Sequence, residues 1–192
     1  MKKLMLMLGM AALLAVPATA KAGGVYEGPA KGMSIIGLRV GLSNIVGVNA
    51  TYDYALARVW KGTFTIGGQV GYMWDGSTVY WKDGLGTYAT QERYSYHNIS
   101  LRVRTTYRFN VVVPEWEVYG GVALGASVTP WSDVGKVNGE IIYRNSGVNA
   151  WVSGAFILGT TYHFTDALGL NLEFDFGDWA TSWVNVGVNY KF

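Results

Sequence analysis

The feature that most limits what this chain can form is an alternation of apolar with small or polar side chains, which recurs in eight runs between residues 36 and 192. Successive side chains of a β-strand point to opposite faces, so a period of two residues predicts strands. No helical period competes with it after the N-terminal segment. The apolar series of the runs begin at Ile36, Val46, Phe64, Ile99, Trp116, Val152, Leu168 and Val184. The sequence therefore predicts an all-β chain.

The connections between the runs differ in length in a regular way. Those around Lys61-Gly62, residues 110–115 and Thr165-Asp166 are short, whereas the connections after the third and fifth runs are long. In a transmembrane barrel the long connections lie on the outer side and the short turns on the inner side. The long ones contain Asp83-Gly84 and Asn138-Gly139, which are dipeptides of tight hairpin turns. We therefore expect two β-ribbons that protrude beyond the bilayer.

Alternation alone does not tell whether the apolar face forms a soluble core or contacts lipid. The apolar face carries many aromatic rings, among them Tyr72, Trp74 and Phe156. The interior of an eight-stranded barrel is only just wide enough for side chains to fill, so these rings are expected to point outwards. The opposite face combines Gly, Ser, Thr and Asn with a few charges, which suits a narrow lumen. The prediction is a transmembrane eight-stranded antiparallel up-and-down β-barrel, with a soluble lipocalin-like barrel as the alternative.

The N-terminus has the pattern of an export signal. Lys2 and Lys3 precede an apolar run over 4–16, which is followed by Pro17 and small residues. As a helix this run would be about 20 Å long, too short for about 30 Å of hydrocarbon, which disfavours a membrane anchor. We expect a signal peptide over 1–22, a lead over 23–32 and the barrel over 33–192. The chain has no Cys, which excludes disulfides, thiolate metal sites and a lipid-modified N-terminal Cys.

Removal of residues 1–22 would also change the charge of the chain. Lys2, Lys3 and Lys21 would leave with this segment, so the balance of Lys and Arg against Asp and Glu would change from 15 − 13 = +2 to 12 − 13 = −1. Nucleic-acid binding needs a basic surface, and none is expected in the mature chain.

The C-terminal run at 184–192 alternates apolar residues and ends with Tyr190 and Phe192. It resembles the last strand of small bacterial outer-membrane barrels: the transmembrane domain of outer membrane protein A, the outer membrane protein X and W groups, and opacity-type proteins. The resemblance covers about residues 32–192 in pattern. It implies location in the outer membrane of a Gram-negative cell, with Tyr190 and Phe192 as the signal for the barrel-assembly machinery.

The inward face carries charges of both signs. Unpaired charges in a narrow lumen are costly, and an arginine can hold two carboxylates at once, so an ion-pair network is expected. Its members would be Arg39, Asp53, Arg102, Arg104, Arg108, Glu117, Glu173, Asp175 and Lys191. Such a network would close the lumen as a packed plug. A narrow pore for small solutes remains the alternative.

Some eight-stranded outer-membrane barrels modify lipid A, which makes catalysis a second alternative. His97 lies near the outer end of the fourth run, with Ser95 nearby and Glu92 as a conceivable orienting acid. Their spacing does not match the deacylase pattern of that group, so we expect no enzyme and no catalytic residues. His163 is expected in the lumen as a structural residue. With two His on different strands, neither a metal site nor a cofactor is expected.

Exposed aromatic residues in the long connections favour contact with a partner. The candidates are Tyr80, Trp81, Tyr88, Trp131 and Tyr143. The expected role is membrane-structural or surface interaction, and the expected partners are outer-membrane lipid and lipopolysaccharide, the barrel-assembly machinery, and a surface protein or host partner.

Overall fold

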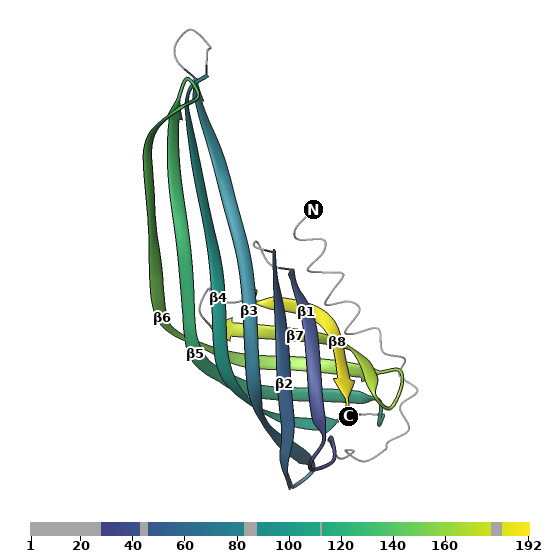
Figure 1. The fold of residues 1–192 in the computed structure, drawn as a ribbon. Coiled ribbons are helices and arrows are strands. Elements are labelled where there is room, and N and C mark those ends of the chain that lie inside the picture. The colour runs from purple at the N-terminus through teal and green to yellow at the C-terminus, as the bar shows by residue number, and fades with distance from the viewer. Residues whose placement is uncertain (1–27, 43–45, 83–87, 112, 178–181) are drawn as a thin grey trace.

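The computed structural model describes residues 28–42, 46–82, 88–111, 113–177 and 182–192 (Figure 1). The strands are β1 (Ser34–Leu42), β2 (Val46–Val59), β3 (Gly62–Lys82), β4 (Tyr88–Asn110), β5 (Trp116–Val137), β6 (Glu140–His163), β7 (Leu168–Gly177) and β8 (Val184–Lys191). Each strand pairs antiparallel with the next, and β8 pairs with β1, so the eight strands form a closed barrel. The predicted fold is confirmed. The expected signal peptide and the first half of the expected lead, residues 23–27, lie outside the described residues.

The barrel closes between β1 and β8. Their register runs from Ile35 opposite Lys191 to Gly41 opposite Asn185. At the end of this seam Ser34 N donates to Phe192 O at 2.9 Å, and Phe192 N donates to Ser34 O at 3.0 Å. A closed ring leaves no unpaired strand edge within the barrel wall, which is what backbone polar groups surrounded by lipid require. The described part of the chain contains no helix with the length and hydropathy needed to cross a bilayer.

Buried and exposed residues alternate along the strands in the predicted sense. On β4, Leu101 and Val103 are 65% and 63% exposed, whereas Arg102 and Arg104 between and beside them are buried. The barrel therefore has an apolar outside and a polar inside. A water-soluble barrel would show the opposite distribution, and the arrangement found here is that of a transmembrane barrel.

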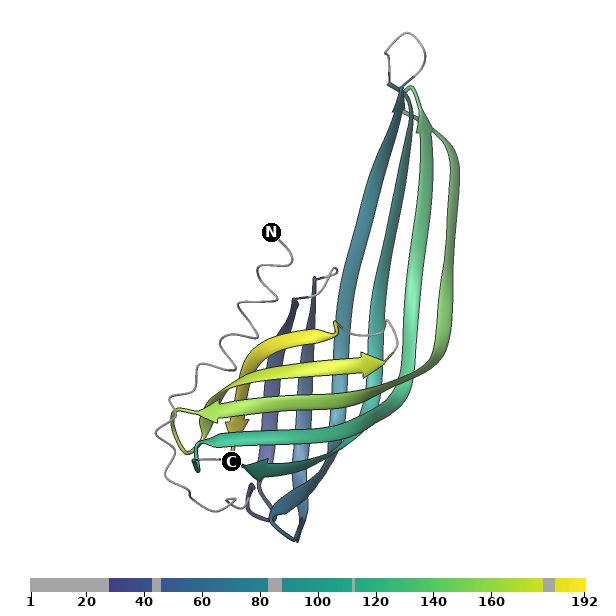
Figure 2. The same ribbon diagram turned by 180° about the vertical axis from the view of Figure 1, so that it is seen from behind.

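Strands β3 to β6 rise well beyond the other four (Figures 1 and 2). We call the part that rises the extension, and it comprises residues 74–82, 88–97, 131–137 and 140–152. The turn between β5 and β6 is the predicted Asn138-Gly139 pair, with φ values of 51° and 87°, as a tight hairpin turn requires. The other predicted turn, Asp83-Gly84, lies outside the described residues.

The extension differs from the prediction in one respect. Within it, β4 also pairs with β5, from Thr90 opposite Val137 to Tyr96 opposite Trp131. The two predicted hairpins are thus present, but they are joined into one four-stranded sheet, which the prediction of two ribbons did not include. An alternating sequence predicts the two strands of a hairpin. It does not tell whether that hairpin pairs with a second hairpin beyond the barrel.

Candidate functional site

The end of the lumen near the short turns, which we call its inner end, contains a group of contacts centred on Arg108 of β4. Its Nη1 donates to Glu117 Oε1 at 2.7 Å, and its Nη2 donates to Asp53 Oδ2 at 2.6 Å. All three side chains are buried. One guanidinium therefore ties β4 to both β5 and β2, since its planar fork can serve two carboxylates.

A second group of contacts surrounds Glu173 on β7. Arg104 Nη2 donates to Glu173 Oε2 at 2.7 Å, and Arg39 Nη2 lies 3.4 Å from the same oxygen. Arg104 Nε also lies 3.2 Å from Asp53 Oδ1, which connects this group to the contacts of Arg108. The carboxylates thus sit between arginines from β1 and β4, and the buried charges offset one another.

The remaining predicted lumen residues lie at the edges of this network. Lys191 Nζ is 3.1 Å from Glu117 Oε2 at the inner end. Further out, Arg102 Nε donates to Ser153 Oγ at 2.6 Å, and Asp175 Oδ2 accepts from Gln69 Nε2 at 3.2 Å. The structure therefore places every predicted network residue in the lumen. His163 is also inside, with Nε2 3.7 Å from Glu117 Oε2.

Tyr119 is a member of the lumen that the sequence analysis did not select. Its hydroxyl donates to Glu173 Oε2 at 2.7 Å, and Arg108 Cζ lies 4.2 Å from the centre of its ring. The ring lies against Gly159 on β6, where any Cβ would overlap it. Tyr119 shares the parity of Glu117, which is the signal that could have identified it. It was concealed because the fifth run is less regular than the others, with Gly120 and Ala126 interrupting its apolar series, and because small lumen residues were expected.

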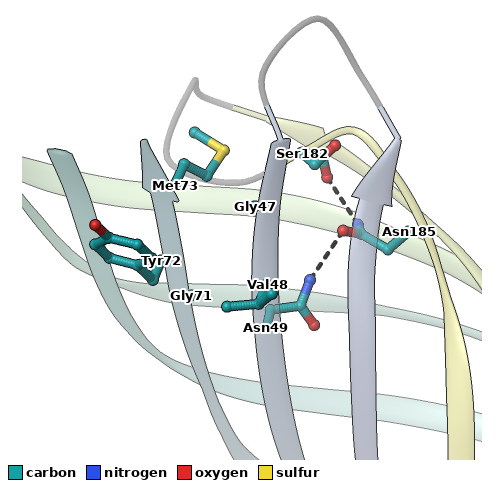
Figure 3. A pocket seen from close by; sticks show the side chains of 8 residues that line it. All are labelled: Gly47, Val48, Asn49, Gly71, Tyr72, Met73, Ser182 and Asn185. Carbon is teal, nitrogen blue, oxygen red and sulfur yellow. Dashed lines mark hydrogen bonds between the residues drawn. The ribbon is translucent and has the colours of Figure 1, made fainter. Parts of the chain in front are cut away.

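Polar contacts among the described residues also lie near both ends of the lumen. At the outer end Asn49 Nδ2 donates to Asn185 Oδ1 at 2.9 Å, and Asn185 Nδ2 donates to the Ser182 carbonyl oxygen at 2.7 Å (Figure 3). The hollow beside them has no room for a water molecule. At the inner end Pro29 is buried, and its carbonyl oxygen accepts from Thr63 Oγ1 at 2.7 Å.

These contacts predict that the barrel does not conduct ions. We expect planar bilayers containing the purified full chain to show no conductance steps, because a passing ion would have to break buried ion pairs. The same bilayers should record steps after an open porin is added, as a control for insertion and detection. Reproducible steps from the chain alone would contradict this prediction and restore the narrow-pore alternative.

The predicted contact residues lie on the extension. Tyr80 and Trp81 are 58% and 60% exposed, on opposite faces of β3. Tyr88 belongs to β4 by its backbone pairing with Lys82, and its side chain is outside the described part. Trp131 lies across Gly147, and Tyr143 lies across Gly135. The small size of these two glycines is what lets an aromatic ring rest over the neighbouring strand.

Tyr143 also makes a polar contact across two strands. Its hydroxyl donates to Glu92 Oε1 on β4 at 2.7 Å, passing over Gly135 on β5. This hydrogen bond to the carboxylate raises the pKa of Tyr143 to about 12, because loss of the proton would place two negative charges side by side. The contact fixes the ring on the face of the sheet.

The residues considered for catalysis have separate partners. Tyr72 Oη and His97 Nδ1 are 2.8 Å apart, while Ser95 Oγ is 2.9 Å from Ser132 Oγ. Glu92 bonds to Tyr143, on the other face of β4 from His97. The structure does not bring these three side chains into the order acid, His and Ser that a nucleophilic site needs. Among the described residues no group of three His, Cys, Asp or Glu side chains is placed to hold a metal ion.

Tyr190 and Phe192 lie on the outer surface near the end of β8. They are 50% and 58% exposed, and their rings stack with centroids 6.0 Å apart. Their role in barrel assembly stays a prediction.

Comparison with known proteins finds solved structures that resemble the barrel. No family model and no curated protein matches the chain. The crystal structure of Ail, the attachment invasion locus protein of Yersinia pestis, is 15% identical, covers 85% of this chain and 100% of its own, and has a TM-score of 0.47. The structure of Ail in complex with the heparin analogue sucrose octasulfate has a TM-score of 0.48. The backbone structure of this outer membrane protein in a phospholipid bilayer nanodisc has a TM-score of 0.45. Identity and coverage are the same for both.

Proposed function

We propose that the chain is a non-enzymatic, integral outer-membrane barrel whose extension binds a partner at the cell surface. The observation that carries this proposal is the joining of two long hairpins into one four-stranded sheet that rises beyond the barrel. A barrel that only stabilised the membrane would need no strands beyond the bilayer. The export signal expected over 1–22 and the aromatic C-terminus support delivery to that membrane.

Placement in a bilayer is supported by the outward surface of the barrel. Leu38, Leu124 and Phe156 are 60%, 64% and 69% exposed, and they belong to three different strands. Exposed apolar residues on this scale are unfavourable in water, at roughly 25 cal/mol for each Å². In a bilayer the same surface contacts hydrocarbon, and this cost does not arise. Lipid and lipopolysaccharide are therefore the proposed neighbours of the barrel wall.

The edges of the extension support a binding role. β3 pairs with β2 as far as Met73, and β6 pairs with β7 from Ala155. Beyond these points each of the two strands has a described neighbour on one side. Along β6 the exposed side chains include Ile141, Ile142 and Val148, at 53%, 57% and 66%. An apolar strand edge of this kind is a template for pairing with an extended segment of another protein.

The charge of the extension does not favour a polyanionic partner. The extension contains four Lys or Arg and four Asp or Glu, a balance of 4 − 4 = 0, and residues 83–87 add Asp83. Ail has been solved with a heparin analogue, which is heavily sulfated, but long-range attraction of such a ligand needs an excess of positive charge. We therefore propose a protein partner for this chain.

The proposal is tested by removing the extension and keeping the barrel. One turn would join Trp74 directly to His97, and a second would join Trp131 to Gly147, because each pair is already opposed across a hairpin. In pull-downs from bacterial-envelope and host-surface extracts, we expect proteins captured by the full chain to be lost with the shortened chain. Circular dichroism would show that the shortened barrel still folds. Capture that persists without the extension would disprove the proposal.

A further inference from the structure

The extension has two chemically different faces. On β4 the even-numbered residues Arg104 and Arg102 point into the lumen, and Tyr96, Tyr94 and Glu92 continue that series above it. We call the face that continues the lumen series the inner face. Residues directly opposite each other on neighbouring strands share a face, so the register identifies the inner-face residues of β3, β5 and β6. The other face continues the lipid-facing surface.

Charge is divided between the two faces. Four carboxylates lie on the inner face, one on each strand of the extension: Asp75, Glu92, Asp133 and, beside the turn between β5 and β6, Glu140 opposite Val137. Among the described side chains of the extension, the basic ones lie on the other face: Arg93, Lys136 and Arg144. The inner face is therefore acidic although the whole extension is nearly neutral.

Aromatic rings gather on the same inner face. They come from all four strands of the extension: Trp81, Tyr94, Tyr96, Trp131, Tyr143 and Trp151. Tyr94 and Tyr96 pack with ring centroids 5.9 Å apart. Figures 1 and 2 show the extension standing clear of β1, β2, β7 and β8, so these strands leave the upper part of the face uncovered.

Three of these carboxylates, those of Asp75, Glu92 and Asp133, have a ring beside them. Asp75 is opposite Tyr96, Asp133 is opposite Tyr94, and Glu92 accepts the hydroxyl of Tyr143. One oxygen of Asp133, Oδ1, is shielded from solvent and has no hydrogen-bond partner among the described residues. A guanidinium or ammonium group over an aromatic ring gains from the ring quadrupole, and a carboxylate next to the ring adds a charge-assisted hydrogen bond.

We propose that the inner face is the docking surface for a cationic partner, an arginine- or lysine-bearing segment of a protein. This inference rests on the proposed function of the extension and adds the face used and the chemistry of the partner. An anionic partner would meet four carboxylates and no described cation on this face. A purely apolar partner would leave those carboxylates without counter-charges when water is removed.

The test uses the full chain in lipid nanodiscs and two short synthetic peptides, one alternating Arg with Ser and one alternating Glu with Ser. Trp81, Trp131 and Trp151 lie on the inner face, so intrinsic tryptophan fluorescence reports binding. We expect the Arg peptide to bind and the Glu peptide not to bind. The inner-face variant Asp75→Asn/Glu92→Gln/Asp133→Asn should bind the Arg peptide about tenfold more weakly.

The matched control removes the same number of charges from the other face: Arg93→Gln/Lys136→Gln/Arg144→Gln. It should bind the Arg peptide as well as the unmodified chain or more tightly, and circular dichroism should show both variants folded. Equal weakening by both variants, or binding of the Glu peptide, would overturn the inference. If the Arg peptide fails to bind while capture in pull-downs still depends on the extension, the cationic partner is wrong and the proposed function stands.

Discussion

Replacing Glu173 with Gln is expected to lower the free energy of unfolding of the barrel by about 3 kcal/mol. Glu173 is fully buried; it accepts hydrogen bonds from Arg104 and the hydroxyl of Tyr119 and forms an ion pair with Arg39. The substitution keeps the size of the side chain and an acceptor oxygen, but removes the negative charge. Arg39 and Arg104 would then be buried with one negative charge fewer beside them.

The measurement is reversible urea unfolding of the full chain in lipid vesicles, followed by tryptophan fluorescence. Glu140→Gln is the matched control, because it makes the same chemical change at an exposed position of the extension. The control should change the free energy of unfolding by no more than about 0.5 kcal/mol. Equal stability of the two variants would show that the lumen charges do not hold the strands together.

A second large effect is expected from adding a single methyl group in the barrel wall. Gly67 on β3 faces the lumen, and a Cβ built there would overlap the backbone carbonyl oxygen of Tyr52 on β2. A backbone atom held in a strand ladder cannot turn aside as a flexible side chain can. We therefore expect Gly67→Ala to lower the free energy of unfolding by about 3 kcal/mol, the upper end for overpacking.

Its neighbour provides the control. At Gly68 the nearest atom to a new Cβ is the Arg102 carbonyl oxygen, 3.7 Å away, which is an ordinary contact. Gly68→Ala should leave stability unchanged or raise it by about 0.5 kcal/mol, since alanine reduces the entropy of the unfolded chain. The same urea titration distinguishes the two variants. A loss of stability at Gly68 equal to that at Gly67 would mean that the close approach of β2 and β3 is not the cause.

Much of the architecture could be predicted because its signals are local. The alternation of Leu101 and Val103 with Arg102 and Arg104 fixes which side chains share a face. The number of rings on the apolar face then decides which side is outside, since a narrow lumen cannot hold them. Asn138-Gly139 likewise predicts a tight turn, because both positions can adopt positive φ. None of these inferences needs knowledge of contacts between distant strands.

The candidate site was less accessible to sequence reasoning. The inward parity of Arg108, Asp53 and Glu117 follows from alternation, but their pairing depends on how far each strand is shifted along its neighbour. Tyr119 was missed because Gly and Ala residues interrupt the apolar series of the fifth run. Its parity with Glu117 points inward, but that the lumen has room for its ring, beside Gly159 on β6, is clear only from the structure. The division of the extension into an acidic aromatic face and a basic face depends on the same register.

The strands, their inner and outer faces and the polar character of the lumen could be read from the sequence alone. These follow from a period of two residues, which is a property of each strand alone. The tertiary structure decided which arginine holds which carboxylate and whether the two long hairpins pair side by side. The physical reason is that closing eight strands into a ring sets their stagger collectively, so contacts between strands far apart in the chain are fixed only when the whole barrel forms.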